Sequence, residues 1–406
     1  MKKRVLSILV AVLLVAITFA ACTGTPAPPA PPAPPASPTP GTPAPPQPSP
    51  PAFDSWAAEH LDDYRSYEEI VARAMEEGHV VWYSNSSRSR AVAEAFMDRY
   101  PGIEVEVFDI STNELVERFS REYAAGIRTA DLLHLGDSDG TLWMEFVMQG
   151  MLHVYRPYDI VPYINPEFLA TAMPMFIEYD AWFYNTEYFS DGPPITSWWD
   201  LTTPEWNGNI MMRHPMDHLG TLGVFTTMVQ HADQMAADYE RVFGTPIQLS
   251  SIAPTAAHEF FVRLMANDPI FLTSSGEIIR TVGEMTDSRF IGLGSSGGLR
   301  RQTEEDLPIQ IVTHLTPGLA TPGISGLYIA DEANNPNAAM LLVRFMTDSV
   351  GEGFAPFDTL GGWSPRFDLP TTPGNRPINE LNFWPNDSEF IYFNALQVAD
   401  FLLLLN

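Results

Sequence analysis

Short β-rich runs alternate with stretches of helical spacing along the first third of the folded chain. Ser66 and Glu69 form a capping box, which predicts a helix that ends near Gly78. Beyond it the pattern predicts strands at 79–83, 103–108 and 131–135, and a helix after each strand. The second of these three helices spans 112–125, and the third ends at Gly150. The order β-α-β-α-β is typical of a parallel, doubly wound sheet.

The same alternation restarts near residue 181. The expected elements are strands at 181–184, 209–213, 270–273 and 290–293, an extended segment at 307–314, and helices at 219–229, 234–242, 255–265 and 337–347. No short internal repeat is visible, which disfavours solenoids and propellers. We therefore predict an α/β fold of two lobes, each with a doubly wound sheet. The expected domains are an N-terminal lobe at 53–180, a C-terminal lobe at 181–315, and a segment at 316–406 that returns across both.

The N-terminus has the pattern of an exported lipoprotein. A positive start at Met1 to Arg4 precedes an apolar run, and small residues lead into Cys22. This arrangement resembles a lipobox, with Phe19 where leucine is usual, and it implies a signal peptide at 1–21 and lipidation of Cys22. A retained transmembrane anchor is the alternative, because the run is just long enough to span a bilayer. Either anchor holds the folded body outside the cytoplasm.

Cys22 is the only cysteine of the chain. The mature fold therefore has no internal disulfide, no thiol nucleophile and no cysteine-based zinc site. The residues that follow it, up to 52, are dominated by proline, which lacks the backbone N–H and fixes φ. We interpret 22–52 as the lipidated cysteine and a semi-rigid polyproline stalk, in preference to a ligand for SH3-type domains.

The charge of the chain is strongly negative. It has 50 Asp and Glu against 22 Lys and Arg, for a formal net charge of −28, and no lysine follows Lys3. A field of this sign repels nucleic acid and anionic lipid headgroups. Nucleic acid is therefore excluded as a partner.

Several motifs, in order along the chain, resemble family 1 of the bacterial extracellular solute-binding proteins, and within it the ferric-iron-type members. They are Val80-Val81-Trp82-Tyr83-Ser84, Phe96-x-x-x-Tyr100-Pro101-Gly102-Ile103-x-Val105, Ala125-Gly126-Ile127-Arg128-Thr129-Ala130-Asp131, Tyr184-Asn185-Thr186, Trp199-Asp200-Leu201, Pro204-x-Trp206-x-Gly208-x-Ile210 and Asn335-Pro336-Asn337-Ala338-Ala339. The resemblance implies a type II periplasmic-binding-protein-like Venus flytrap, which closes on a ligand by a hinge motion.

That resemblance also implies a function. The chain would deliver a small molecule or metal complex to the permease subunits of an ABC importer, as a monomer at the cell surface or in the periplasm, held to the membrane by its lipid anchor, with no cofactor. Iron-binding members offer an adjacent tyrosine pair as ligands, and this sequence contains no Tyr-Tyr dipeptide. The resemblance therefore does not assign ferric iron as the ligand.

Polar side chains gather where the predicted strands end, which is where doubly wound sheets bind ligands. The candidates for ligand binding are Tyr83, Ser84, Ser86, Ser87, Arg88, Asp137, Ser138, Arg213, Ser274, Ser275, Ser295 and Arg300. Free N–H groups, hydroxyls and guanidinium groups suit an anion, so we expect a small oxyanion or a ferric or other metal–anion complex. Helix capping is the alternative role for the serines and Asp137, and sugars, polyamines and short peptides remain open as ligands.

His214 and His218 are spaced four residues apart, which on a helix would let them share a metal ion. Pro215 argues against one helix holding both, so a metal site here is the less favoured interpretation. The sequence has no His-Glu-x-x-His zinc helix and no cysteine nucleophile, so we do not expect an enzyme. A surface sensory or interaction protein on the same fold, or an exported hydrolase, are the alternatives to a transport receptor.

Overall fold

A computed structural model describes residues 55–405, which form one compact unit. The predicted signal peptide, Cys22 and the proline-rich stalk lie outside the described residues. Within 55–405 no helix combines the length and the apolar character needed to cross a membrane.

The first sheet has the strand order β2-β1-β3-β11-β4, with β5 paired to β11. Its strands are β1 (His79–Ser84), β2 (Glu104–Asp109), β3 (Leu132–Gly136), β4 (Leu152–His153), β5 (Met173–Glu178) and β11 (Gly323–Ala330). β1 is parallel to β2 and β3, whereas β11 is antiparallel to β3, β4 and β5. The first three strands confirm the sequence pattern, but the sheet is mixed because a late strand enters it beside β3. We call this sheet and its helices the first lobe.

The helices of the first lobe are α1 (Ser55–His60), α2 (Tyr67–Glu77), α3 (Ser89–Arg99), α4 (Thr112–Ala124), a π-helix at Leu142–Val147 and α10 (Pro336–Thr347). Ser66 caps α2, accepting a hydrogen bond from the Glu69 backbone N–H, but the Glu69 carboxylate accepts from Arg73, so only the Ser66 half of the predicted capping box is present. The predicted cap of α3 by Ser86 or Ser87 is wrong, because Arg88, one residue after Ser87, stands at the N-cap and no side chain caps the helix. Asn335 stands at the N-cap of α10 without a side-chain cap, and the Glu77 carboxylate accepts from the α10 N-terminus instead.

The second sheet has the order β10-β6-β9-β7-β8. Its strands are β6 (Asp180–Asn185), β7 (Ile210–Met212), β8 (Ile270–Phe271), β9 (Ile291–Ser295) and β10 (Ile309–Ile311), and the helices around it are α5 (Leu219–Gln230), α6 (Ala232–Phe243), α7 (Ala256–Ala266), α8 (Ser275–Glu284), α9 (Arg301–Glu304) and α11 (Ser388–Leu403). We call this sheet and its helices the second lobe. β6 runs antiparallel to β9 and β10, so this sheet is also mixed.

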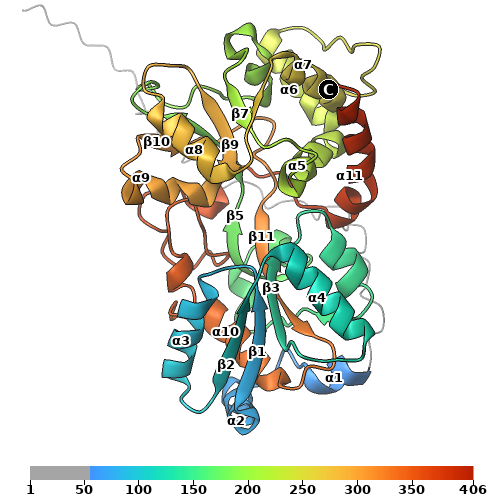
Figure 1. Cartoon of the computed structure of the whole chain (residues 1–406), viewed down its shortest axis with the longest axis vertical. Helices are drawn as coiled ribbons and strands as arrows, with labels where there is room; N and C mark the ends of the chain where they lie inside the picture. The colour runs from blue at the N-terminus through green and yellow to red at the C-terminus, as the bar shows by residue number, and fades with distance from the viewer. Residues whose placement is uncertain (1–54, 406) are drawn as a thin grey trace, which may run out of the picture. The chain divides into compact units, whose positions relative to one another are not determined.

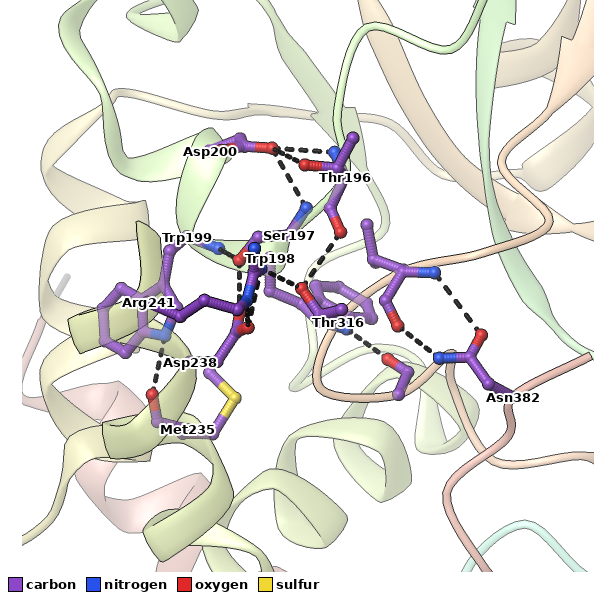
Figure 2. Close-up of polar contacts among 12 residues, drawn as sticks. Thr196, Ser197, Trp198, Trp199, Asp200, Met235, Asp238, Arg241, Thr316 and Asn382 are labelled. Carbon is purple, nitrogen blue, oxygen red and sulfur yellow. Dashed lines mark hydrogen bonds and ion pairs between the residues drawn. The ribbon is translucent and has the colours of Figure 1, made fainter. Parts of the chain in front are cut away.

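A network of hydrogen bonds and ion pairs links several segments of the second lobe, as Figure 2 shows. Ser197 and Asp200 form a capping box, and the Ser197 hydroxyl donates to the buried Asp238 carboxylate at 2.6 Å. Arg241 pairs with Asp238 and also donates to the Thr316 hydroxyl. Thr316 belongs to the connection from β10 to β11, so the network ties α6 to a segment that passes between the lobes.

Tyr179 alone separates β5 of the first sheet from β6 of the second. Figure 1 shows β5 and β11 in the middle of the view, where the chain passes from one sheet to the other. The Tyr179 backbone N–H donates to the Ser296 hydroxyl, its own hydroxyl donates to the Val312 carbonyl, and its ring contacts Trp363 and Phe383. The crossing between the sheets is therefore buried and well packed, and it brings the residues on either side of Tyr179 to the junction of the lobes.

Candidate functional site

Two partly buried carboxyl groups flank Tyr179 at the crossing. Glu178 Oε2 accepts a hydrogen bond from the Ser295 hydroxyl at 2.8 Å, and Asp180 Oδ1 accepts from the Arg213 guanidinium at 3.4 Å. Burial raises the pKa of both acids, and the hydrogen bond from Ser295 and the charge of Arg213 respectively act against that rise. Burial thus disfavours the charged form of both acids at the junction.

Arg88 approaches this junction from the first lobe. Its guanidinium lies 5.2 Å from the ring centroid of Phe357 and 5.7 Å from that of Phe176. Burial and the nearby charge of Arg300 lower the pKa of Arg88, against the charges of Glu178 and Glu304. Within residues 55–405 no hydrogen bond or ion pair engages its guanidinium, so its donors are available to a ligand.

Arg300 reaches the junction from the second lobe, in the 3-10 turn Ser296–Arg300 that follows β9. Its guanidinium donates to the Gly297 carbonyl at 2.6 Å, and its Nε lies 3.4 Å from Glu304 Oε2. A Cβ on Gly297 would sit 2.6 Å from Glu178 Oε2, so any larger residue here would push the carboxylate aside. The turn therefore presents a cation beside the crossing.

The loop after β7 supplies Arg213, His214 and His218. His218 caps α5 by accepting from the Thr221 N–H, and burial and the Arg213 charge lower the pKa of His218 to about 4, so its imidazole is neutral. The His214 ring packs edge-on against Phe271 at 4.5 Å. The described residues contain no group of three or more His, Cys, Asp and Glu side chains that could hold a metal ion. The structure thus uses these histidines as a cap and an aromatic contact.

The other candidate residues near the end of β1 make contacts in different parts of the first lobe. Tyr83 is buried and its hydroxyl donates to the carboxylate of Glu122 in α4, and Ser84 is buried with its hydroxyl 3.0 Å from His134 Nδ1. The Ser86 hydroxyl accepts from the Arg88 N–H, while Ser87 is exposed. Of this group, Arg88 faces the charged junction.

Asp137 and Ser138 follow β3. The Asp137 carboxylate accepts from two backbone N–H groups of the π-helix, each at 3.1 Å, and burial raises the pKa of Asp137 to about 6. Ser138 has an exposed side chain, and its carbonyl lies so close to α5 that a Cβ on Gly223 would be 2.8 Å away. Asp137 therefore acts as a cap, and Ser138 marks a point where the two lobes meet.

The remaining candidates, Ser274 and Ser275, make structural contacts within the second lobe. Ser274 caps α8 by accepting from Glu277 N–H, as the capping alternative predicted, and the Ser275 hydroxyl accepts from Ser295 N–H at 2.9 Å. Ser275 thus supports the position of Ser295, which in turn holds Glu178.

Gly294 to Gly298 also match the Gly-x-Ser-x-Gly spacing of a hydrolase nucleophile turn, with Ser296 at its centre. Ser296 is fully buried, its hydroxyl donates to the Gly361 carbonyl at 2.6 Å, and the same oxygen accepts from Tyr179 N–H. Its hydroxyl is occupied in linking the crossing to a C-terminal loop, so it is not placed as a nucleophile.

Sequence reasoning missed four residues of the junction: Phe176, Glu178, Asp180 and Phe357. The two acids are drawn from 50 in the chain and carry no motif. Their position on either side of the single residue between two strands is the one signal that could have singled them out. The two phenylalanines lie far apart in sequence, and only the fold places both against Arg88.

Comparison with solved structures shows the same fold in several proteins. Iron-bound HitA from Pseudomonas aeruginosa is 18% identical with a TM-score of 0.58, and apo ferric ion-binding protein A from Pasteurella haemolytica is 16% identical with a TM-score of 0.61. In each case the match covers 81% of this chain and 99% of the other. AfuA from Actinobacillus pleuropneumoniae, with exogenous fructose-6-phosphate bound, is 17% identical with a TM-score of 0.57, over 80% of this chain and 97% of that one. These matches confirm the predicted two-lobed, type II periplasmic-binding-protein fold.

The comparison with curated protein sequences gave no match. A family model described as bacterial extracellular solute-binding protein matches residues 91–373, well over half of the chain. This match confirms the expectation of a solute-binding protein of ABC import rather than an enzyme. The chain belongs to the family of bacterial extracellular solute-binding proteins.

Proposed function

We propose that this protein is the receptor of an ABC importer for a small oxyanion, which binds at the junction of the lobes between Arg88 and Arg300, with Arg213 beside it. The observation that carries the proposal is the state of Arg88. Its guanidinium is partly buried against Phe176 and Phe357 and has no ion-pair partner among residues 55–405. A cation withdrawn from water without a partner is costly, and an anionic ligand removes that cost.

The position of the two arginines links binding to closure of the lobes. Arg88 belongs to the first lobe and Arg300 to the second, and burial together with the charge of Arg300 lowers the pKa of Arg88. Bringing the lobes together therefore brings two like charges together. An anion between them converts this repulsion into two attractions, so it favours the closed form over the open one. The permease would then recognise the closed form.

The chemistry of the junction favours a phosphate ester or similar oxyanion over bare ferric ion. Guanidinium groups match the paired oxygens of phosphate and carboxylate. The chain lacks an adjacent tyrosine pair, and residues 55–405 contain no group of three or more His, Cys, Asp or Glu side chains that could hold a metal ion. One similar structure has fructose-6-phosphate bound, which supports this class of ligand on the same fold.

A thermal-stability screen of the purified protein tests the proposal. The panel is fructose 6-phosphate, other phosphate esters, phosphonates, carboxylates, ferric citrate, neutral sugars and polyamines. A ligand present at 100 times its Kd adds about 2.7 kcal/mol of stability. We expect the shift from an oxyanion, its loss in the Arg88→Ala, Arg300→Ala double variant, and its retention in Arg73→Ala, which removes a half-exposed arginine elsewhere. Binding only of polyamines, or an undiminished shift in the double variant, would refute the site.

We also propose that Cys22 carries a lipid that anchors the receptor at the outer face of a membrane, with the proline-rich segment as a spacer. The support is the order of charged start, apolar run and small residues before the only cysteine. Metabolic labelling with an alkyne fatty acid in a bacterial host should mark the wild-type protein and not Cys22→Ala. Equal labelling of both, or release of the wild-type protein into the soluble fraction, contradicts the anchor.

A further inference from the structure

A second recess lies in the first lobe, away from the charged junction. It has a volume of about 300 Å³ and is bounded by the start of α2, the ends of α3 and α10, and the loops at 159–163 and 366–368. None of its lining residues belongs to the junction of the lobes. A space of this size equals the share of roughly ten water molecules and falls at the lower end of small-molecule sites.

Two buried arginines form its floor. Arg344 and Arg366 are only 5% and 6% exposed. Arg366 binds both oxygens of Asp368, at 3.0 and 2.7 Å, and Arg344 pairs with Asp159. Arginine is rarely this buried, and burying its ion pairs costs several kcal/mol of desolvation. Within 55–405, Arg344 Nε is also buried without a hydrogen-bond partner, which adds to the cost of burying this side chain.

Tyrosines form much of the wall. The Tyr67 and Tyr100 hydroxyls are hydrogen-bonded to each other at 2.7 Å, and the half-exposed Tyr163 stands at the rim. Arg344 lies 5.8 Å from the Tyr67 ring centroid and Arg366 lies 5.0 Å from that of Tyr163. The recess therefore combines flat aromatic surface with hydroxyl, carboxylate and guanidinium groups.

The charges of the recess are already balanced in pairs, and this restricts the ligand. Asp348, the third acid of the lining, is paired with Arg99 at 2.8 Å. An incoming ion of either sign would have to break an existing pair. A neutral molecule with several hydroxyl groups would not, since it can donate to the carboxylates, exchange hydrogen bonds with the Tyr67 and Tyr100 hydroxyls and place an apolar face on a tyrosine ring.

We propose that this recess binds a single neutral sugar ring, as a site separate from the transport ligand. The sugar can be a free monosaccharide or the terminal residue of a surface polysaccharide, because both present the same ring and hydroxyl groups. In the second case the recess would hold the receptor to the glycan of its own cell surface.

Isothermal titration calorimetry of the purified protein tests the site. The probes are glucose, galactose, N-acetylglucosamine and their methyl glycosides, and a co-sedimentation arm uses insoluble glucan and chitin. We expect one sugar type to bind and the Tyr67→Phe, Tyr100→Phe double variant, which keeps both rings, to raise its Kd at least tenfold. Tyr64→Phe is the matched control, because Tyr64 is 79% exposed and does not line the recess.

The outcomes separate this site from the junction. Binding that survives Arg88→Ala and fails in the tyrosine double variant supports it, with the calorimetric and co-sedimentation arms assigning it to free sugar or polymer. If no neutral sugar or polymer binds, the proposal is overturned. It is also overturned if the double variant, shown to be folded by its thermal melt, binds as the wild type does, or if Arg88→Ala abolishes the binding.

Discussion

Replacing Arg88 with methionine separates ligand binding from stability. The change removes the guanidinium and keeps an unbranched apolar side chain against Phe176 and Phe357. A hydrogen bond from a charged donor contributes about 1.5–3 kcal/mol, and about 1.4 kcal/mol changes Kd tenfold. The variant should therefore bind fructose 6-phosphate, the probe chosen for the phosphate-ester class, about 10- to 150-fold more weakly.

The same change should leave the fold almost as stable as before. Loss of the cation–π contacts costs about 0.5–1 kcal/mol at a partly exposed site, and methionine sulfur recovers part of that contact with the rings. Removing the charge also relieves both causes of the lowered pKa of Arg88, the burial of its charge and the repulsion from Arg300. We expect the free energy of unfolding without ligand to change by less than about 1 kcal/mol.

Calorimetric titration and urea unfolding give the two readings. The matched control is Arg73→Met, which removes a half-exposed arginine paired with Glu69 and should affect neither. An unchanged Kd for Arg88→Met would refute the role of this residue in binding. An equal loss of affinity in the Arg73→Met control would show that overall charge, and not the junction, governs the result.

Three further substitutions test how the junction and the first lobe are held. Gly361→Ala should lower the free energy of unfolding in urea by more than about 2 kcal/mol, because φ is +78° and the new Cβ would lie 1.7 Å from the Ser296 carbonyl. The control Gly126→Ala, at φ +72° with nothing within 4 Å of the new Cβ, should lower it by only about 1–2 kcal/mol. Equal losses of stability in the two variants would contradict the clash at Gly361. Asp131→Ala should cost about 3 kcal/mol or more, since its carboxylate accepts from three buried or part-buried N–H donors, and a loss below about 1 kcal/mol would argue against that role. His134 is buried and burial lowers its pKa from 6.5 to about 4, so its contribution to stability is complete above pH 6.5 and is lost as the pH falls toward 4. The wild type should thus lose on the order of 3 kcal/mol more than His134→Gln between pH 7 and 4, and parallel pH profiles would contradict this.

Local signals allowed most of the secondary structure to be predicted. Ser66 caps α2, and the strand predicted at 79–83 is β1, because a capping box and a β-rich run act through neighbouring residues. The prediction failed for the cap of α3, where two adjacent serines matched the motif equally and the chain turned one residue later. It also missed β5, β11 and α11, whose apolar runs carried no flanking signal that the sequence analysis used.

Some features of the candidate site could likewise be predicted from the sequence, and others could not. Arg88, Arg213 and Arg300 were predicted from their places after β-rich runs, and the structure brings all three to one junction. Tyr83 and Ser84 share the sequence position of a ligand loop, yet their side chains are buried in contacts with Glu122 and His134. The direction of a side chain at a strand end depends on what packs above it, which sequence spacing does not specify.

The sequence by itself determined the two α/β halves, the export signal pattern, the acidic charge and the arginines that follow the strands. These depend on composition and on contacts within a few residues. Only the tertiary structure decided that β11 joins the first sheet beside β3, that Glu77 binds the start of α10 and that Glu178 stands beside Arg88 and Arg300. These contacts join residues far apart in the chain. They form because both sheets are buried only when the C-terminal segments pack against them. A local sequence pattern carries no information about which distant residues it will contact.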